Sequence, residues 1–189
     1  DASLDWHLLE DERHAGVARW LEDLARLYNG EPALHELDCS PEGFDWVDGS
    51  DADNSVIAFL RRGKAGEPVL VVLHFTPVVR ENYRLGVPGR GYWRELLNSD
   101  APRYGGGGVG NYGGVEAVPI PMHGKSHSLT LTLPPLGVLF FKRDVVEDPK
   151  DSKEARDVED ELDETAEMEP VAEDTPEDDG FPPNLASIL

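Results

Sequence analysis

The spacing of apolar residues changes once along this chain, and that change restricts the fold more than any other feature. Near the N-terminus the apolar residues recur at i, i+3, i+4 and i+7, the spacing of one buried helix face. This face consists of Val17, Trp20, Leu21, Leu24, Leu27 and Tyr28. From residue 44 onward the spacing becomes two, which is typical of half-buried strands. The chain is therefore predicted to form one clear helix followed by strands.

The helix has recognisable ends. Asp11 and Glu12 suit the positive end of its dipole, and Asn29-Gly30 predicts a left-handed stop before Pro32. The apolar face needs a partner, because packing supplies most of the stability of a helix. Two partners stay open: an edge or face of the strand region, or a domain outside this chain, of which this would be the last helix.

About eight short runs, bounded by Gly, Pro, Asn and Asp clusters, are the predicted strands. They are Phe44–Val47, Ser55–Arg61, Val69–Phe75, Tyr83–Val87, Tyr92–Leu97, Val115–Pro121, Ser128–Leu133 and Gly137–Lys142. The leucines of LTLTL at 129–133 face one way and the threonines the other. The run at 69–73 is apolar on both faces, so it should be a central strand. Strands without helices between them predict a mainly β fold, an antiparallel β-sandwich.

Negative charge is concentrated at the C-terminal end of the chain, which has 38 acidic and 17 basic residues in total. Residues 144–189 hold 18 of the acids but only 3 of the bases, together with five prolines and one aromatic residue. This acidic tail is predicted to be disordered; a solvated helix around 153–167 is the alternative. The net charge of −21 argues against binding to nucleic acid or to anionic membranes.

Several features favour a cytoplasmic location. The single cysteine, Cys39, cannot form an internal disulfide, which suits a reducing compartment. We find no signal peptide, and no run approaches the roughly 18 apolar residues of a membrane span. The chain starts at Asp1 rather than Met, which hints that it begins inside a longer protein.

Motifs for catalysis and for cofactors are weak. Gly105, Gly107 and Gly110 satisfy GxGxxG, but the strand before and the helix after are missing, so we predict a flexible inter-strand loop. The histidines lack the spacing of a zinc site, and nothing marks Cys39 as an activated nucleophile. Acidic residues are too common for any pair to be specific. We therefore predict no catalytic residue, no metal and no cofactor in this chain.

The tryptophans divide into predicted core residues and one suspected surface residue. Trp20 belongs to the apolar helix face, and Trp46 and Trp93 alternate within strands, so they are predicted to be core. Trp6 lies in the loop-like segment SLDWHLLE and has no evident core role. It is the first aromatic that we suspect of stacking on a flat ligand such as a sugar ring.

Nine motifs along the chain carry a family resemblance. They are SLDWHLLE at 3–10, HAGVARWLEDLARLY at 14–28, EPALHELD at 31–38, PEGFDWVD at 41–48, NSVIAFLRR at 54–62, VVLHFTPVVRENYRLGVP at 71–88, WRELLNSD at 93–100, YGGGGVGN at 104–111 and HGKSHSLTLTLPPLGVLFFK at 123–142. In this order they resemble the C-terminal part of bacterial 1,4-α-glucan (glycogen) branching enzymes of the α-amylase superfamily. One departure stands out: the family usually has Asn where this chain has His74.

The resemblance implies a domain organisation and an activity. Residues 1–39 would be the end of a catalytic (β/α)₈ barrel (a cleft loop and the last helix), residues 40–143 the C-terminal β-sandwich, and residues 144–189 an appended tail. The parent protein would act in glycogen biosynthesis, transferring an α-1,4-glucan segment to a 6-hydroxyl to form α-1,6 branches. Its catalytic carboxylates would lie upstream, so this chain alone is predicted to be inactive.

The same resemblance implies partners and contacts. The expected partners are an α-glucan, such as glycogen or amylose-like chains, and the upstream barrel of the same protein. Asp5, Trp6 and His7 would lie near the substrate cleft and are the predicted substrate-binding residues.

Other functions stay open at this point. The chain could be a stand-alone sandwich that binds glucan without chemistry, or the C-terminal domain of another α-amylase superfamily enzyme, such as a debranching or trehalose-forming hydrolase. It could also be a structural shield for the barrel. The tail could serve solubility at high salt or recruit a basic partner, and its apolar end, Leu185–Leu189, is either a docking motif or a frayed terminus.

Overall fold

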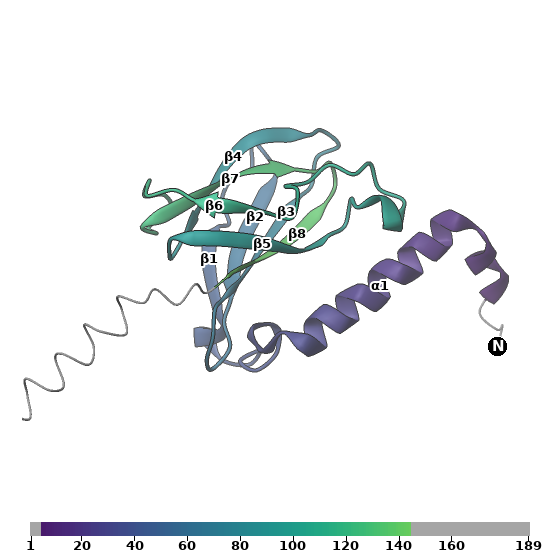
Figure 1. Cartoon of the computed structure of the whole chain (residues 1–189), viewed down its shortest axis with the longest axis horizontal. Coiled ribbons are helices and arrows are strands. Elements are labelled where there is room, and N and C mark those ends of the chain that lie inside the picture. The colour runs from purple at the N-terminus through teal and green to yellow at the C-terminus, as the bar shows by residue number, and fades with distance from the viewer. Residues whose placement is uncertain (1–4, 145–189) are drawn as a thin grey trace, which may run out of the picture. The chain divides into compact units, whose positions relative to one another are not determined.

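The computed structural model describes residues 5–144, which form one α-helix and two β-sheets (Figure 1). A short 3₁₀ helix, η1 (Trp6–Glu10), precedes the helix α1 (Glu12–Gly30). Three further 3₁₀ turns lie in loops: η2 (Pro32–Leu34), η3 (Pro41–Gly43) and η4 (Pro102–Tyr104). The predictions made for the acidic tail concern residues outside the described range, apart from residue 144.

Helix α1 begins where the sequence predicts. The Asp11 carboxylate accepts a hydrogen bond of 2.9 Å from the Arg13 N–H and caps the helix. The helix also ends at Gly30, but the predicted left-handed stop is wrong, since Gly30 has no positive φ. Instead, Pro32 forces the preceding Glu31 into an extended conformation (φ −113°), and the Glu31 N–H donates to the Leu27 carbonyl.

Eight antiparallel strands follow, and each overlaps a predicted run. They are β1 (Phe44–Asp48), β2 (Val56–Arg61), β3 (Val69–His74), β4 (Arg80–Val87), β5 (Gly91–Asn98), β6 (Gly114–Ala117), β7 (His127–Leu133) and β8 (Val138–Arg143). Six form a sheet in the order β1-β2-β3-β8-β5-β6, and β4 pairs with β7 in a second sheet. The predicted antiparallel sandwich is confirmed, with two sheets of unequal size.

The boundary of β6 differs most from its prediction. The predicted strand runs to Pro121, but β6 ends at Ala117. Pro119 and Pro121 lack the backbone N–H that a strand ladder needs. After Ala117, residues 118–121 make only an isolated bridge, from Val118 to Ser128 of β7. Proline therefore ends this strand.

The main core lies between the two sheets. Its largest fully buried side chains are Trp93 and Phe141. The three leucines of β7 at 129, 131 and 133 are at most 1% exposed, while Thr130 and Thr132 are half-buried. The predicted alternation of this strand is confirmed.

A second, smaller core covers the other face of the six-stranded sheet. Val69, Val71 and Phe140 are buried there, and Trp20 and Leu24 of α1 pack against them. Strand β3 therefore contributes to both cores, because its neighbouring residues Leu70 and Val72 belong to the main one. This confirms its predicted central position, between β2 and β8.

Three of the six residues of the apolar helix face pack against the six-stranded sheet. Trp20, Leu24 and Leu27 are half-buried in the second core. The remaining three residues of the face stay exposed, namely Val17 (57%), Leu21 (59%) and Tyr28 (44%). The helix thus packs on the sandwich, the first of the two partners considered from the sequence. It still leaves an apolar strip in contact with solvent.

The N-terminal half of α1 is held close to η4. Gly16 is buried there, and a Cβ at this position would lie 2.4 Å from the Tyr104 carbonyl oxygen. The Trp20 and Tyr104 rings meet edge to face at 5.3 Å. Next to them, the Asp23 carboxylate accepts a hydrogen bond from the Tyr104 hydroxyl (2.7 Å) and forms an ion pair with Arg103 (2.9 Å). Only glycine at position 16 allows this approach.

Acid should loosen this contact between α1 and η4. The hydrogen bond from Tyr104, aided by the charges of Arg103 and Arg26 and opposed by burial, holds the Asp23 pKa below its ordinary value of 3.8. A carboxyl whose pKa is lower in the folded state stabilises that state above its unfolded pKa, and the stabilisation is lost as pH falls through the folded value. We expect the NMR signal of the Trp20 indole to change below about pH 4.

An Asp23→Asn variant is the control for this prediction. Its Trp20 signal should already be altered near neutral pH and should change little in acid. A Trp20 signal that is identical in the two proteins across the titration would contradict the role given to Asp23.

Candidate functional site

The predicted substrate-binding residues Asp5, Trp6 and His7 lie together at the start of η1, beyond the N-terminal end of α1 (Figure 1). All three are exposed, and Trp6 has 68% of its surface accessible. The turn is held by the Asp5 carbonyl, which accepts from the Leu8 N–H at 3.0 Å. The turn presents an exposed indole, and a contact of these residues with substrate stays a prediction.

A second exposed indole belongs to Trp46, for which the prediction of a core position is wrong. Trp46 is 56% exposed, whereas Trp93 is fully buried as predicted. The reason is the place of β1 at the edge of the six-stranded sheet. The next residue, Val47, points into the main core, so Trp46 points to the opposite face, where α1 does not cover it.

Trp46 forms an aromatic platform with Phe44 and Phe59. Trp46 and Phe59 are cross-strand partners, so the three rings share one face of the sheet. Phe44 stacks on Phe59 at 4.9 Å, and Trp46 meets Phe44 edge-on at 4.8 Å. Such contacts hold the rings in place, which lowers the entropy cost of binding a flat ligand. The alternation of residues along β1 could not reveal this platform. The packing of distant elements decides which face of β1 is covered.

An apolar groove of about 510 Å³ lies between α1 and the sheet. Leu21, Leu24 and Tyr28 line it from the helix, and Phe59 and Val71 from the sheet. Because Phe59 also belongs to the aromatic platform, the groove and the platform adjoin. The exposed strip of α1 therefore continues into the platform.

Ion pairs anchor the strand that carries the platform. Asp45, between Phe44 and Trp46, accepts hydrogen bonds from Lys125 (2.7 Å) and Arg62 (3.0 Å). Burial raises the pKa of Asp45, but the hydrogen bonds from these two cations outweigh it and lower the pKa below its usual value. The edge strand is thus tied to Arg62, directly after β2, and to Lys125.

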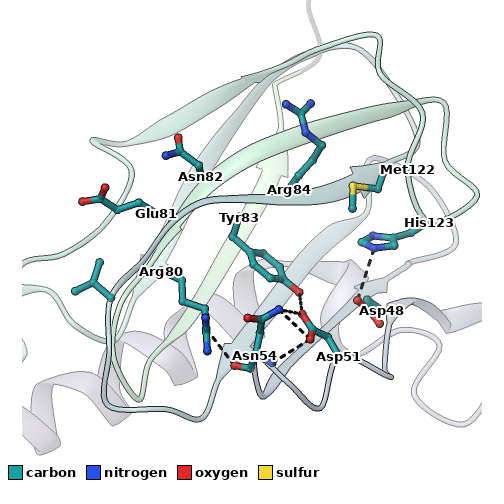
Figure 2. A pocket seen from close by; sticks show the side chains of 11 residues that line it. Asp48, Asp51, Asn54, Arg80, Glu81, Asn82, Tyr83, Arg84, Met122 and His123 are labelled. Carbon is teal, nitrogen blue, oxygen red and sulfur yellow. Dashed lines mark hydrogen bonds and ion pairs between the residues drawn. The ribbon is translucent and has the colours of Figure 1, made fainter.

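A polar cavity of about 490 Å³ opens beside β4 (Figure 2). Its floor is built around Asp51, whose carboxylate accepts from the Tyr83 hydroxyl (2.7 Å) and from the backbone N–H of Asn54 (3.0 Å). Burial opposes ionisation of Asp51, yet these hydrogen bonds hold its pKa below the usual range. Burial and the same hydrogen bond raise the Tyr83 pKa well above its ordinary value.

Two further pairs complete the cavity wall. The His123 Nε2 lies 3.6 Å from an Asp48 carboxylate oxygen, and Arg80 Nε donates to the Asn54 carbonyl at 3.3 Å. Figure 2 shows these side chains converging on one side of β4, while Glu81 and Asn82 point away from them. Residues from three separate segments meet here, which no local sequence pattern could indicate.

The glycine-rich segment is an inter-strand loop between β5 and β6, as predicted. The Asp100 carboxylate accepts from the backbone N–H groups of Gly107 and Val109, both at 2.9 Å. Asn111 fixes the other end of the loop and is 7% exposed. The loop is therefore held by its own side chains, and strand β6 follows it rather than a helix.

The remaining candidate groups are dispersed. His74 is buried at the end of β3, with Nδ1 2.7 Å from the Pro134 carbonyl oxygen and Nε2 2.6 Å from the Thr76 hydroxyl, so both ring nitrogens have partners. Cys39 is exposed and free. Within residues 5–144 no three His, Cys, Asp or Glu side chains gather in a way that could hold a metal ion. None of the helices described here is long and apolar enough to cross a membrane.

The fold defines a class of protein: a β-sandwich domain of two antiparallel sheets with a helix packed on one face. Residues 46–144 match the family model described as alpha amylase, C-terminal all-beta domain. The chain therefore belongs to this family, as the resemblance in its sequence implied.

Curated relatives are similar over most of the chain. A protein of Aromatoleum aromaticum named 1,4-alpha-glucan branching enzyme GlgB is 55% identical over 80% of this chain and 24% of its own length. Proteins of the same name from Cereibacter sphaeroides and Aquifex aeolicus are each 57% identical, over 74% and 76% of this chain and 19% and 23% of their own lengths. The chain thus spans about a fifth to a quarter of the relatives it matches.

Solved structures also match, and one of them is a trehalulose synthase mutant in complex with Tris. It is 23% identical and covers 67% of this chain and 20% of its own, with a TM-score of 0.38.

Proposed function

We propose that this chain is the C-terminal part of a glycogen branching enzyme and supplies glucan-contacting surface to it. The similarity to proteins named 1,4-alpha-glucan branching enzyme GlgB supports this assignment. Such an enzyme transfers an α-1,4-glucan segment to a 6-hydroxyl with retention of configuration, through two carboxyl groups. We place those carboxyl groups upstream of this chain, which has no activity alone.

The proposed domain organisation follows from the same assignment. Residues 1–39 complete the catalytic barrel, residues 40–143 form the C-terminal sandwich, and residues 144–189 are an appended acidic tail. The exposed strip of α1, made by Val17, Leu21 and Tyr28, then packs against the upstream barrel. An apolar strip of this kind is unfavourable in water and suits an interface between domains.

The observation that carries the proposed glucan contact is the aromatic platform. Trp46 has more than half of its surface exposed and is held by Phe44 and Phe59. Aromatic rings that present an apolar body at a wet surface are typical of recognition sites. The C–H face of a glucose ring is flat and weakly polar, so it can stack on such a ring. Asp5, Trp6 and His7 are proposed as a second contact, near the cleft of the parent enzyme.

A Trp46→Ala substitution tests the platform. We expect the affinity of the 189-residue chain for maltoheptaose to fall about tenfold, the loss of one well-packed aromatic contact. Isothermal titration calorimetry gives the dissociation constants, and thermal melting should show an intact fold, because Trp46 is at the surface. Replacement of Tyr112, which is fully exposed on the glycine-rich loop, is the matched control and should leave the affinity unchanged.

Equal affinities of the wild-type and Trp46→Ala chains would reject the platform as a glucan contact. A stand-alone glucan-binding module is the second candidate function, since the platform favours it equally. The intact mass of the protein that carries this chain in cells separates the two: a product several times 20.8 kDa supports the branching enzyme, and a product of 20.8 kDa supports the module.

A further inference from the structure

The polar cavity beside β4 has a lining of both charges, which the proposed platform contact does not use. Asp48 and Asp51 supply carboxylates, and Arg80 and His123 supply nitrogen donors. Its volume of about 490 Å³ lies in the range of roughly 300–1,000 Å³ that is usual for small-molecule sites. The cavity is therefore large enough to hold a ligand and has polar groups that converge on it.

A bulge in β1 turns Asp48 toward this cavity. Trp46 pairs with Phe59, yet Asp48, two residues later, pairs with Ala58, only one residue away on β2. Without the extra residue Asp48 would point to the same face as Trp46. A bulge re-aims a side chain in this way and often lies next to a functional site. The platform and the cavity thus lie on opposite faces of the same edge strand.

The polar groups of the cavity are held in place before any ligand binds. Asn54 donates to both Asp51 carboxylate oxygens from its side chain, at 3.0 and 2.7 Å, and Tyr83 adds its hydroxyl at 2.7 Å. His123 accepts from the Gly86 N–H at Nδ1 (3.3 Å), which leaves Nε2 directed at Asp48. Preorganised donors and acceptors reduce the entropy cost of binding.

Backbone strain is concentrated at the same place. Asn82 (φ 57°) and His123 (φ 49°) line the cavity, and both have left-handed backbone conformations. These conformations are unfavourable for any residue other than glycine, so the surrounding structure must stabilise them. Ser55, directly after the loop that carries Asp51, is left-handed as well (φ 50°). Strain of this kind is found at binding sites more often than elsewhere.

The charge pattern selects a neutral ligand with many hydroxyls. A cationic ligand would be repelled by Arg80, and an anionic ligand by Asp48 and Asp51. The lining therefore suits neither a cation nor an anion. A sugar hydroxyl both donates and accepts hydrogen bonds, and neighbouring hydroxyls can bridge a carboxylate and a guanidinium. We infer that this cavity is a carbohydrate-binding subsite that takes a glucose unit of an α-glucan chain, separate from the aromatic platform. The inference rests on the proposed function for its choice of glucan.

The test maps maltoheptaose on the 189-residue chain by NMR, residue by residue. The amides of Asn54, Tyr83 and His123 should shift saturably as the sugar is added. They should still shift in a Trp46→Ala variant, because the platform lies on the other face. A D48N/R80Q double variant should weaken the affinity reported by these amides about fivefold or more, because it removes a charged acceptor and charged donors. Glu116→Gln, at an exposed position on β6, is the control for loss of charge.

The outcomes separate this inference from the proposed function. Saturable shifts restricted to the platform would overturn the carbohydrate subsite and leave the platform as the glucan contact. If no amide shifts saturably, both the subsite and the aromatic platform are rejected as glucan contacts. Cavity shifts that persist unchanged in the D48N/R80Q variant would also overturn the subsite, since its binding groups would then be dispensable.

Discussion

Replacement of Trp93 by alanine is expected to destabilise the fold by about 3–5 kcal/mol, the usual cost of removing a large buried aromatic side chain. Trp93 is fully buried in the main core, and its indole N–H donates to the Gly89 carbonyl at 3.4 Å. Domains of this size are stable by only about 5–15 kcal/mol, so the loss takes a large part of the total. Urea unfolding followed by circular dichroism measures the change.

The same substitution at Trp46 is the matched control. Trp46 is more than half exposed, so its removal should alter the free energy of unfolding by about 1 kcal/mol or less. Equal destabilisation by the two substitutions would contradict the positions that the structure assigns to these tryptophans. The pair also separates stability from binding, because only Trp46 belongs to the aromatic platform.

Substitution of Asn111 by alanine is expected to cost about 1–3 kcal/mol, because it leaves backbone groups without partners. The Asn111 side chain accepts from the Thr132 N–H (2.8 Å) and donates to the Thr132 carbonyl (3.1 Å). It also donates to the Glu95 carboxylate at 3.1 Å. Asn111 thus acts as an extra strand partner for β7 and fixes the glycine-rich loop between two strands.

Thermal melting and hydrogen exchange of the Thr132 amide measure this effect. Exchange should become faster in the Asn111→Ala variant, since the amide loses its acceptor. The neighbouring residue provides the control: Tyr112 is fully exposed, so Tyr112→Ala should change stability by about 0.5 kcal/mol or less. Unchanged exchange at Thr132 in the Asn111 variant would show that the loop does not depend on this side chain.

The strands were predictable because their signal is local. Whether a side chain of β7 faces the core depends on its parity along the strand, so LTLTL at 129–133 was enough to orient that strand. The two apolar faces of 69–73 likewise indicated a central strand. The stop of α1 was predicted at the correct residue but with the wrong geometry, since Pro32 acts through Glu31 and not through a left-handed Gly30.

The surfaces proposed to bind ligand were less predictable. The alternation of residues along a strand places Trp46 and Trp93 each on one face of a strand. It does not show whether other elements cover that face. Trp93 lies on β5 between β8 and β6, whereas Trp46 lies on the edge strand β1, outside the reach of α1. Exposure here depends on the position of the strand in the sheet, which follows from long-range pairing.

The sequence of this chain determined the order of its elements, the orientation of its strands and its family, because periodicity and motifs are properties of neighbouring residues. The packed fold added the two surfaces that we propose as ligand contacts. The bulge between Trp46 and Asp48 sends one side chain to each face, and the polar cavity joins residues about 30 to 75 positions apart. Such sites arise only when distant segments pack together, so the physical reason lies in burial and pairing across the whole domain.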